Sequence, residues 1–456
     1  MMIIDRVFRE LVFWIAWIVI PLIWEIINGL IAAFVALASH IKDKNSNDKE
    51  IYLPDVAILV PVYNSEKTLK MCLDSIVNQN YPHDRIHVML IDNGSRDNSF
   101  NVFKEFQKEN PQLNAWWFYS EQGKSKALNK GIFSSHGKYI INIDSDGWLD
   151  QNAIKNIVCR FEKNKEIACM TGVILINHKL IEQTNNFFLK LVRKCELFEY
   201  VESFLIARKA QSVTNSLYTL SGAFSCFRTS VLLKTQMYNS ITVGEDTHMT
   251  FQIKEALNGK VALCENAFFY TDPIDSLNKL YTQRQRWQRG EIEVASLYTE
   301  SHLGTLRDFF NKYAMRILIT DHTMTFPRLI WYFAMFYLYF INYPLKLIIG
   351  ANVFVYLLYA FSSFLFFGIA KLFLNGQKDM NRYITKNVYI CFLMPLYRFL
   401  VYWIRMAGII NSMGTMSKWK ATSFSEEVNA VKNEINTQYK SRMRFIKIIE
   451  RLFNNE

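Results

Sequence analysis

The sequence predicts an α/β domain with a mostly parallel sheet and flanking helices, combined with α-helical transmembrane segments. Between residues 55 and 290, short apolar runs rich in β-branched residues alternate with helical patterns, which is typical of βαβ units. Half of all residues are hydrophobic, and long uncharged stretches lie on both sides of the alternating region. Such stretches are typical of membrane-spanning helices.

The first 50 residues are expected to form a transmembrane anchor and a linker. Residues 11–37 contain a single charged side chain, Glu25, and are long enough to cross a bilayer. Residues 36–38 fit a signal-peptidase site, but the apolar stretch is too long for a signal peptide, so we expect an uncleaved anchor. Lysines in the polar segment 42–50 favour the cytosolic side for the domain that follows.

Three predicted strands each end in polar residues. Val56–Val60 leads to Pro61 and Asn64, Val88–Ile91 leads to Asp92, and Tyr139–Ile143 leads to Asp144 and Asp146. Each motif alone also fits a turn or the cap of a following helix, such as the one expected over Lys67–Gln79. Because the carboxyl ends of parallel strands meet at one edge of a sheet, the three together predict a polar crevice for a ligand.

Asp144 and Asp146 predict a site for positive charge. Two carboxylates one residue apart repel each other unless a cation lies nearby, and a divalent cation on a diphosphate would supply that charge. Lys124, near the start of a helix that opens with Gln122–Leu128, suits a nucleotide phosphate, although a single lysine more often points into solvent.

Three later segments each have a structural and a functional interpretation. Small residues in Tyr218–Phe227 would let the backbone approach a ligand. Glu245 and Asp246 precede a helix expected over Met249–Leu257, where they fit either a helix cap or a catalytic pair. Gln283–Glu291 is basic with one tryptophan, which fits a membrane-surface helix or a binding site.

Seven motifs in this order resemble those of the family 2 glycosyltransferases: P-V-Y-N, I-D-N-G-S, G-K-S-K-A-L-N, I-D-S-D, S-G-A-F-S-C-F-R, G-E-D-T and Q-R-Q-R-W. The last fits the Q-x-x-R-W signature of processive, membrane-embedded members that make cellulose, hyaluronan or poly-N-acetylglucosamine. The motifs are also similar to those of glycosyltransferases associated with exosortase G sorting systems of Gram-positive bacteria.

The resemblance implies a cytosolic, nucleotide-sugar-binding GT-A domain over residues 51–300. It implies transfer of a sugar, with inversion, from a UDP-sugar to a cell-surface polysaccharide or glycoconjugate with the help of Mg²⁺ or Mn²⁺. The implied nucleotide-sugar contacts are Pro61, Tyr63, Glu66, Asp92, Lys124 and Asp144. The implied metal ligands are Asp146 and Asp144, and the implied catalytic acids are Asp246, as general base, and Glu245. Gly222, Gln283, Arg286 and Trp287 are implied to hold the diphosphate and the acceptor.

Two positions depart from the family pattern. Asn93 and His248 stand where many relatives have Asp. His248 is expected either to face the crevice beside Asp246 or to be a surface residue.

Two other functions compete with this interpretation: a transferase that adds one sugar to a lipid or protein, and an inactive scaffold that partners a synthase. The acids Asp92, Asp144, Asp146 and Asp246 argue against a scaffold.

Beyond residue 300 we expect interfacial helices over 301–325, transmembrane helices within 326–412 and a basic amphipathic tail over 413–456. Leu329–Ile349 and Ala351–Phe373 predict two spans separated at Gly350. Tyr389–Ile410 is a weaker span because Arg398 and Arg405 interrupt it. The two arginines share one helical face, which fits snorkelling to the interfaces or a polar path for a saccharide or lipid phosphate.

The topology stays open at the sequence level. Four full spans would put both termini outside, whereas the basic tail fits the inner leaflet. We expect a multi-pass cell-membrane protein whose partners are the UDP-sugar, a saccharide, lipid-linked or protein-linked acceptor, the bilayer, and exosortase-system or polysaccharide-export proteins. The net charge is +11, and its basic residues flank apolar spans, as is expected near an anionic membrane surface. We therefore expect no nucleic acid as a partner. Seven scattered cysteines without a C-x-x-C pair predict no disulfide framework or zinc site.

Overall fold

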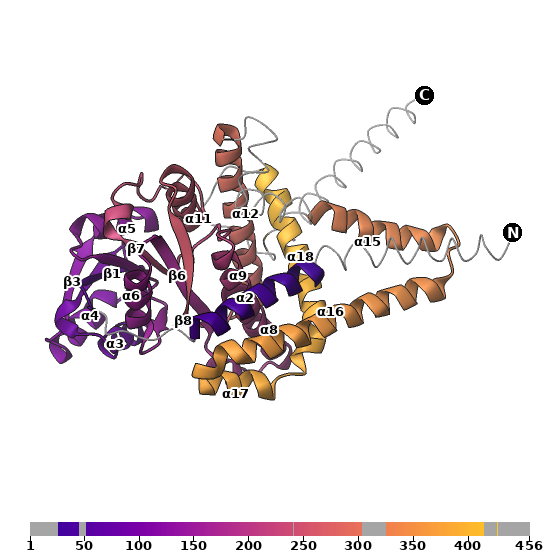
Figure 1. The fold of residues 1–456 in the computed structure, drawn as a ribbon, viewed down its shortest axis with the longest axis horizontal. Coiled ribbons are helices and arrows are strands. Elements are labelled where there is room, and N and C mark those ends of the chain that lie inside the picture. The colour runs from indigo at the N-terminus through magenta and orange to yellow at the C-terminus, as the bar shows by residue number, and fades with distance from the viewer. Residues whose placement is uncertain (1–25, 45–51, 240, 303–324, 415–425, 427–456) are drawn as a thin grey trace, which may run out of the picture.

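The computed structural model describes residues 26–44, 52–239, 241–302, 325–414 and 426. An α/β unit fills one side of the molecule, and long helices extend from its other side (Figure 1). Most of the predicted anchor, the predicted linker after residue 44, most of the predicted interfacial segment 301–325 and nearly all of the predicted tail lie outside the described residues. The predicted domain boundaries stay predictions.

The sheet has eight strands in the order β3-β2-β1-β4-β7-β6-β8-β5. In chain order the strands are β1 (Val56–Val62), β2 (Ile86–Asp92), β3 (Asn114–Tyr119), β4 (Tyr139–Ile143), β5 (Gly147–Leu149), β6 (Ile167–Ile176), β7 (Phe224–Arg228) and β8 (Lys260–Thr271). Strands β3, β2, β1 and β4 are parallel, as are β6 and β8. Strand β7 is antiparallel to both β4 and β6, and β5 is antiparallel to β8.

The sheet is therefore mixed: the expectation of parallel strands holds for β3, β2, β1 and β4 and for the β6–β8 pair, and it is wrong at β7 and β5. The reason is that β6 and β7 are buried almost throughout. A strand covered on both faces is a continuous apolar run whichever way it points, so strand direction cannot be read from that pattern.

The helices of the α/β unit include α3 (Leu69–Val77), α4 (Ser99–Glu109), α5 (Lys124–Ser134), α6 (Ala153–Lys163), α7 (His178–Glu182), α8 (Phe187–Tyr200), α9 (Arg208–Val213), α10 (Thr229–Leu232), α11 (Glu245–Phe251) and α12 (Leu277–His302). A short 3₁₀ turn covers His83–Arg85. Two π-helical turns, η4 (Val201–Ala207) and η5 (Gln252–Ala256), continue α8 and α11. The helix expected over Met249–Leu257 thus begins four residues earlier, at Glu245.

Alternate residues of the central strands fill two cores. Ile58, Val88 and Ile141 belong to one core, and Ala57 and Leu59 belong to the core on the opposite face. This alternation follows from the two-residue period of a strand. The first core also contains side chains of α2 (Asn28–Lys44) and of the later helices, so the extended helices are joined to the α/β unit by a common apolar interior.

In the described part of the chain, four helices follow the α/β unit: α15 (Thr325–Phe340), α16 (Leu345–Phe373), α17 (Lys378–Lys386) and α18 (Ile390–Gly414). A 3₁₀ turn, η6 (Leu374–Gly376), follows α16. Among the described residues, α16 with its extension to Gly376 and α18 to Asn411 are long and apolar enough to cross a membrane. In Figure 1, α15 and α16 run outward together, whereas α18 lies along α12.

The break between the two apolar runs lies at residues 341–344, and the predicted break at Gly350 is wrong. Asn342 has a left-handed φ of 60°, and Pro344 immediately precedes α16. Proline suits a helix start because it has no backbone N–H to leave unpaired. Gly350 lies inside α16, and a Cβ there would meet no heavy atom within 4 Å. Nothing around Gly350 therefore requires a turn.

Candidate active site

One cavity of about 550 Å³ contains most of the predicted site residues. Its walls come from the carboxyl end of β4, the start of α5, the α8–η4–α9 segment, the start of α11, the middle of α12 and α18. The predicted site residues in its lining are Lys124, Asp144, Asp146, Gly222, Glu245, Asp246, Gln283, Arg286 and Trp287. The structure thus brings together motifs that are far apart in the sequence.

Asp144 and Asp146 follow β4, and a lysine holds the first of them. Lys124 Nζ lies 2.6 Å from Asp144 Oδ1. Burial alone would lower the pKa of Lys124, but Asp144 and then Glu245 outweigh burial and raise that pKa. The lysine is therefore held as a cation. Burial and the neighbouring Asp144 carboxylate raise the pKa of Asp146 to about 6, although Lys124 opposes them.

This carboxylate pair fits a divalent cation on the donor diphosphate. The raised pKa of Asp146 reflects buried negative charge that Lys124 only partly compensates, and a bound cation would compensate it. Among the described residues, no group of three or more His, Cys, Asp or Glu side chains is placed to hold a metal. The rest of the coordination shell would therefore come from diphosphate oxygens and water, as is usual for Mg²⁺.

Asp246 lies in the first turn of α11 and is fixed from two sides. The backbone N–H of Gly222 donates to Asp246 Oδ2 at 3.1 Å, and the N–H of Thr247 donates to Oδ1 at 2.8 Å. The residue at the cap position of α11 is Gly244, so the interpretation of Asp246 as the helix cap is wrong. Burial raises the pKa of the adjacent Glu245, and Lys124 opposes that rise.

Two glycines bring α11 against α12. A Cβ built on Gly290 would lie 2.8 Å from the Cα of Gly244, and one built on Gly244 would lie 2.9 Å from the backbone of Gly290. Neither contact leaves room for a side chain, because both involve backbone atoms. The close approach places the start of α11, with Glu245 and Asp246, beside the segment of α12 that contains Arg286 and Trp287.

Gln283, Arg286 and Trp287 lie in the first half of α12, within the α/β unit. The Trp287 ring is 5.9 Å from that of Phe204, and the Arg284 guanidinium lies 4.3 Å from its centroid. Gln283 Oε1 is buried and has no hydrogen-bond partner in the described structure. A buried amide oxygen without a partner is costly, so its place in the cavity lining is consistent with a ligand that donates to it.

Several lining residues were not predicted from the sequence. Arg208, at the start of α9, donates to Ser221 Oγ and lies over the Phe204 ring at 4.5 Å. Burial lowers the pKa of Arg208 to about 10, against the nearby Tyr218, Asp246 and Glu291. Arg405 of α18 lines the same cavity and donates from Nε to Gln288 Oε1 at 2.6 Å.

The remaining predicted nucleotide contacts lie at the ends of β1 and β2, outside the lining of this cavity. Asp92 is buried and accepts from the backbone N–H of Ser95 at 2.8 Å. Tyr63 is 44% exposed, and Glu66 accepts from the Asn98 side chain at 3.3 Å. Pro61 lies within β1.

The β1–β2 edge adjoins the carboxylate pair through short contacts. Ser65 Oγ lies 2.7 Å from Ser145 Oγ, between the two aspartates. Asn93 Oδ1 accepts at 2.5 Å from the backbone N–H of Gly123, which directly precedes Lys124. Asn93 thus has a structural role beside Lys124.

His248 is neither a crevice residue nor a surface residue. It is buried in α11, is absent from the cavity lining, and lies with Nδ1 3.3 Å from Gln252 Nε2. Two residues along a helix turn a side chain to the opposite face, so His248 points away from the cavity that Asp246 enters. None of the seven cysteines, all of which lie among the described residues, forms a disulfide.

Comparison with known proteins shows which proteins the α/β unit is similar to. Residues 57–234 match the model of glycosyl transferase family 2. The chain is 26% identical over 368 residues to a poly-beta-1,6-N-acetyl-D-glucosamine synthase of Staphylococcus epidermidis, an overlap of 78% of this chain and 82% of that protein. It is 23% identical over 434 residues to "Probable glycosyltransferase YdaM" of Bacillus subtilis, with 93% and 97% coverage.

The fold is also similar to a solved structure. A mannosyltransferase from Pyrobaculum calidifontis, PcManGT, in complex with GDP-Man and Mn²⁺ matches with a TM-score of 0.51 and 13% identity. The match covers 85% of this chain and 96% of that one. These comparisons support a family 2 glycosyltransferase domain with a GT-A-like fold, related to a polysaccharide synthase.

Proposed function

We propose that the protein is a membrane-bound, inverting glycosyltransferase that extends a cell-surface polysaccharide or glycoconjugate from a UDP-sugar, in line with the match of residues 57–234 to the family 2 model. The observation that carries this proposal is the composition of the cavity. A lysine-held carboxylate pair, an acid fixed at the start of a helix, and the Q-x-x-R-W residues line one space of about 550 Å³.

The donor occupies the strand-end side of the site. Asp92 recognises the uracil edge, and Pro61, Tyr63 and Glu66 line the nucleotide. Lys124 and Arg286 place positive charge beside the diphosphate, which favours UDP as a leaving group. Asp146 and Asp144 would hold Mg²⁺ or Mn²⁺, which would neutralise diphosphate charge as a Lewis acid.

The acceptor occupies the α11–α12 side. Asp246 removes the proton from an acceptor hydroxyl as that oxygen attacks the anomeric carbon from the face opposite UDP. The new C–O bond forms as the bond to the UDP oxygen breaks, so the anomeric configuration inverts and no covalent enzyme intermediate is needed. The Trp287 face and Gln283 Oε1 hold the acceptor sugar through stacking and a hydrogen bond, and Gly222 lets the acceptor approach Asp246.

Membrane attachment and partners complete the proposal. The apolar helices α16 and α18 support a cell-membrane location. The lysines of residues 42–50 support a catalytic domain on the cytosolic side. The motif likeness to exosortase G-associated enzymes supports a sorting-system protein as a partner.

The experiment measures UDP release by purified protein with Mn²⁺ and a panel of UDP-sugars. We expect Asp246→Asn to reduce the rate by at least about 100-fold, as loss of a general base does, while UDP binding by calorimetry persists. Asp84→Asn, at an exposed aspartate outside the cavity, is the matched control. A full rate in Asp246→Asn would contradict the assigned base. A product ladder on a sizing column supports chain extension, and a single-sugar product supports the rival transferase.

A further inference from the structure

The last described helix, α18, is attached to the catalytic domain along nearly its whole length. We propose that α18 lies in the plane of the membrane interface, with its outer face in lipid, and forms the membrane-side wall of the catalytic cavity instead of crossing the bilayer. This inference does not rest on the proposed function.

The inner face of α18 packs on α8 and α12. Ile390, Met394, Val401 and Ile404 share an apolar cluster with residues of those two helices. Gly408, near the other end, is so close to α12 that a Cβ there would lie 3.3 Å from the Cα of Gln285. From Ile390 to Gly408 the helix therefore has the catalytic domain as its neighbour.

Polar contacts on the same face bind α18 to residues beside the cavity. Tyr397 donates to Glu199 Oε2 at 2.8 Å, which also accepts from Arg284. Arg398 pairs with Glu202 at 2.5 Å, and Arg405 donates to Gln288. The two arginines thus point at the catalytic domain, and neither one snorkels along the helix to a membrane surface.

The charged side chains of α12, the helix on which α18 packs, argue against a membrane-spanning position for α18. Its segment beside α18 contains Arg284, Arg286, Arg289, Glu291 and Glu293. A charged residue in the bilayer centre is strongly unfavourable, and α12 also borders the cavity that holds polar side chains. If α18 crossed the hydrocarbon layer, its contacts would take this charged helix into the same layer.

The outer face of α18 is suited to lipid. Every exposed side chain of α18 up to residue 411 is large and apolar: Phe392, Leu396, Phe399, Leu400, Trp403 and Ile410. Tyr332 of α15 contacts Phe399, Tyr402 and Trp403 through ring contacts of 5.3–6.4 Å. Aromatic side chains of this kind concentrate at the interface between bilayer and water, so we assign the lipid interface to this face.

The way in which α18 crosses α16 indicates how α18 is oriented relative to the bilayer. Contacts to α16 come from the first turns of α18: Cys391 and Arg398 both contact Ser363, and the ring of Phe392 lies 4.8 Å from that of Phe364. Beyond these turns α18 leaves α16 and follows α12, as Figure 1 shows. A helix that runs across a membrane-spanning α16 lies along the surface of the bilayer.

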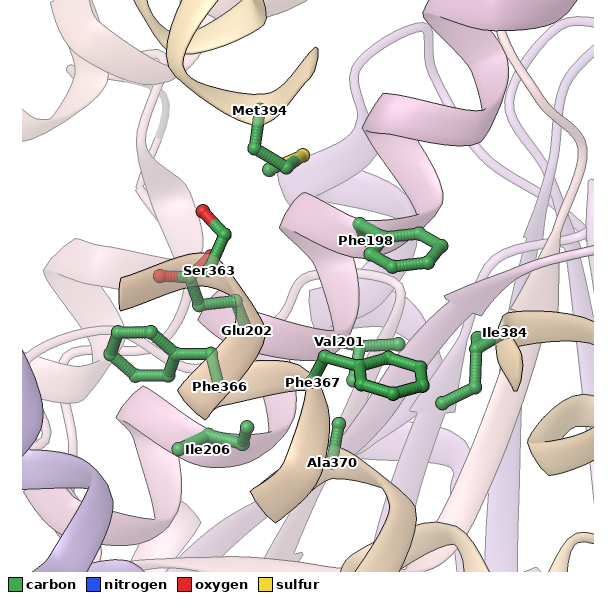
Figure 2. Close-up of a pocket in the computed structure, with 10 residues that line it drawn as sticks. All are labelled: Phe198, Val201, Glu202, Ile206, Ser363, Phe366, Phe367, Ala370, Ile384 and Met394. Atoms are coloured by element: carbon green, nitrogen blue, oxygen red, sulfur yellow. The ribbon is translucent and has the colours of Figure 1, made fainter. Parts of the chain in front are cut away.

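The region where α18 crosses α16 is tightly packed. Figure 2 shows the pocket between η4, α16 and α18, with Phe198, Phe367 and Met394 around it. Its volume is about 20 Å³, room for a single water molecule. Side chains therefore fix the relative direction of the two helices.

Spin-label depth measurements test this arrangement. Single nitroxide labels are attached at Phe392→Cys, Trp403→Cys and Ile410→Cys in protein reconstituted into phosphatidylethanolamine–phosphatidylglycerol vesicles. Depth is read from collisions with oxygen and a water-soluble nickel chelate. Leu357→Cys, exposed in the middle of α16, supplies a deep reference, and the wild-type chain measures labelling of native cysteines.

We expect the three α18 labels to report one shallow depth, within about 5 Å, the rise of one helical turn. In a spanning helix, residues 392 and 410 would lie about 27 Å apart along the bilayer normal, in opposite leaflets. A Trp403 label as deep as the Leu357 label, or depths that place Phe392 and Ile410 in opposite leaflets, would overturn the proposal. Phe399→Cys gives the same reading if the Trp403 variant does not fold.

Discussion

His248 is a buried side chain of α11, packed beside Gln252 and Tyr298. Burial lowers its pKa below 6.5, so the folded protein binds the proton more weakly than the unfolded chain does. The folded state is therefore favoured above pH 6.5 and loses stability as the pH falls through the lowered pKa.

We expect His248→Asn to lose less thermal stability than the wild type between pH 7 and pH 5, measured as melting temperature against pH. His136→Asn, at an exposed histidine, should keep the slope of the wild type. Parallel slopes for wild type and His248→Asn would refute this account, and a changed metal preference in His248→Asn would restore a role at the site.

The candidate site residues that could be predicted from the sequence are those whose side chains are unusual at their positions in the chain. Asp144 and Asp146 interrupt an apolar strand end, and Asp246 follows a turn, so both sites could be predicted. Arg208 could not, because an arginine in a helix is usually solvated, and for Arg405 the sequence left snorkelling and a polar path both open. Packing alone turns these two into the cavity, and no local pattern encodes that direction.

The contact between Gly244 and Gly290 determines how α11 meets α12. We expect Gly290→Ala to push these backbones apart, with at least a 10-fold loss of UDP release and a loss of about 1–3 kcal/mol in the free energy of unfolding. Gly350→Ala, in open space within α16, is the control and should be neutral or stabilising by up to about 1 kcal/mol. Full transferase activity in Gly290→Ala would show that the two helices tolerate separation.

Elements with a strong local signal could be predicted from the sequence. Strand β4 has the expected bounds, Tyr139–Ile143, because its apolar run stops at charged residues. The antiparallel entry of β7 depends on how the chain returns from α9, which no local pattern encodes. The hairpin break was misplaced because Gly350 resembles a helix end, whereas Pro344 and Asn342 form the real one.

At the scale of the whole molecule, a buried charge cluster joins the N-terminal helix to the sheet. Lys209 Nζ lies 2.6 Å from Glu265 Oε2 with no exposed side-chain surface, and His40 of α2 lies 3.0 Å from Glu265 Oε1. Ala33 and Ala36 of α2 and Phe373 of α16 belong to the same apolar core as the strands. The helices and the catalytic domain should therefore unfold together.

We expect Glu265→Gln to lower the free energy of unfolding by about 3–5 kcal/mol, because it removes a carboxylate from a buried ammonium. Intrinsic fluorescence and protease cleavage near α2 should report a single transition. Glu166→Gln removes the exposed partner of Lys260 and should change stability by less than about 1 kcal/mol. Two separate transitions would contradict a common core.

The residues that line the cavity come from two different stretches of the chain. Lys124, Asp144 and Asp146 lie within residues 57–234, the stretch shared with the family, whereas Asp246, Trp287 and Arg405 lie beyond it. In the proposed assignment, the donor contacts except Arg286 are thus encoded apart from the acceptor contacts except Gly222. Substitutions after residue 234 that spare Asp246 and Arg286 are expected to exchange one acceptor for another while the donor chemistry is conserved, so descendants of one ancestral enzyme should diverge first in what they elongate.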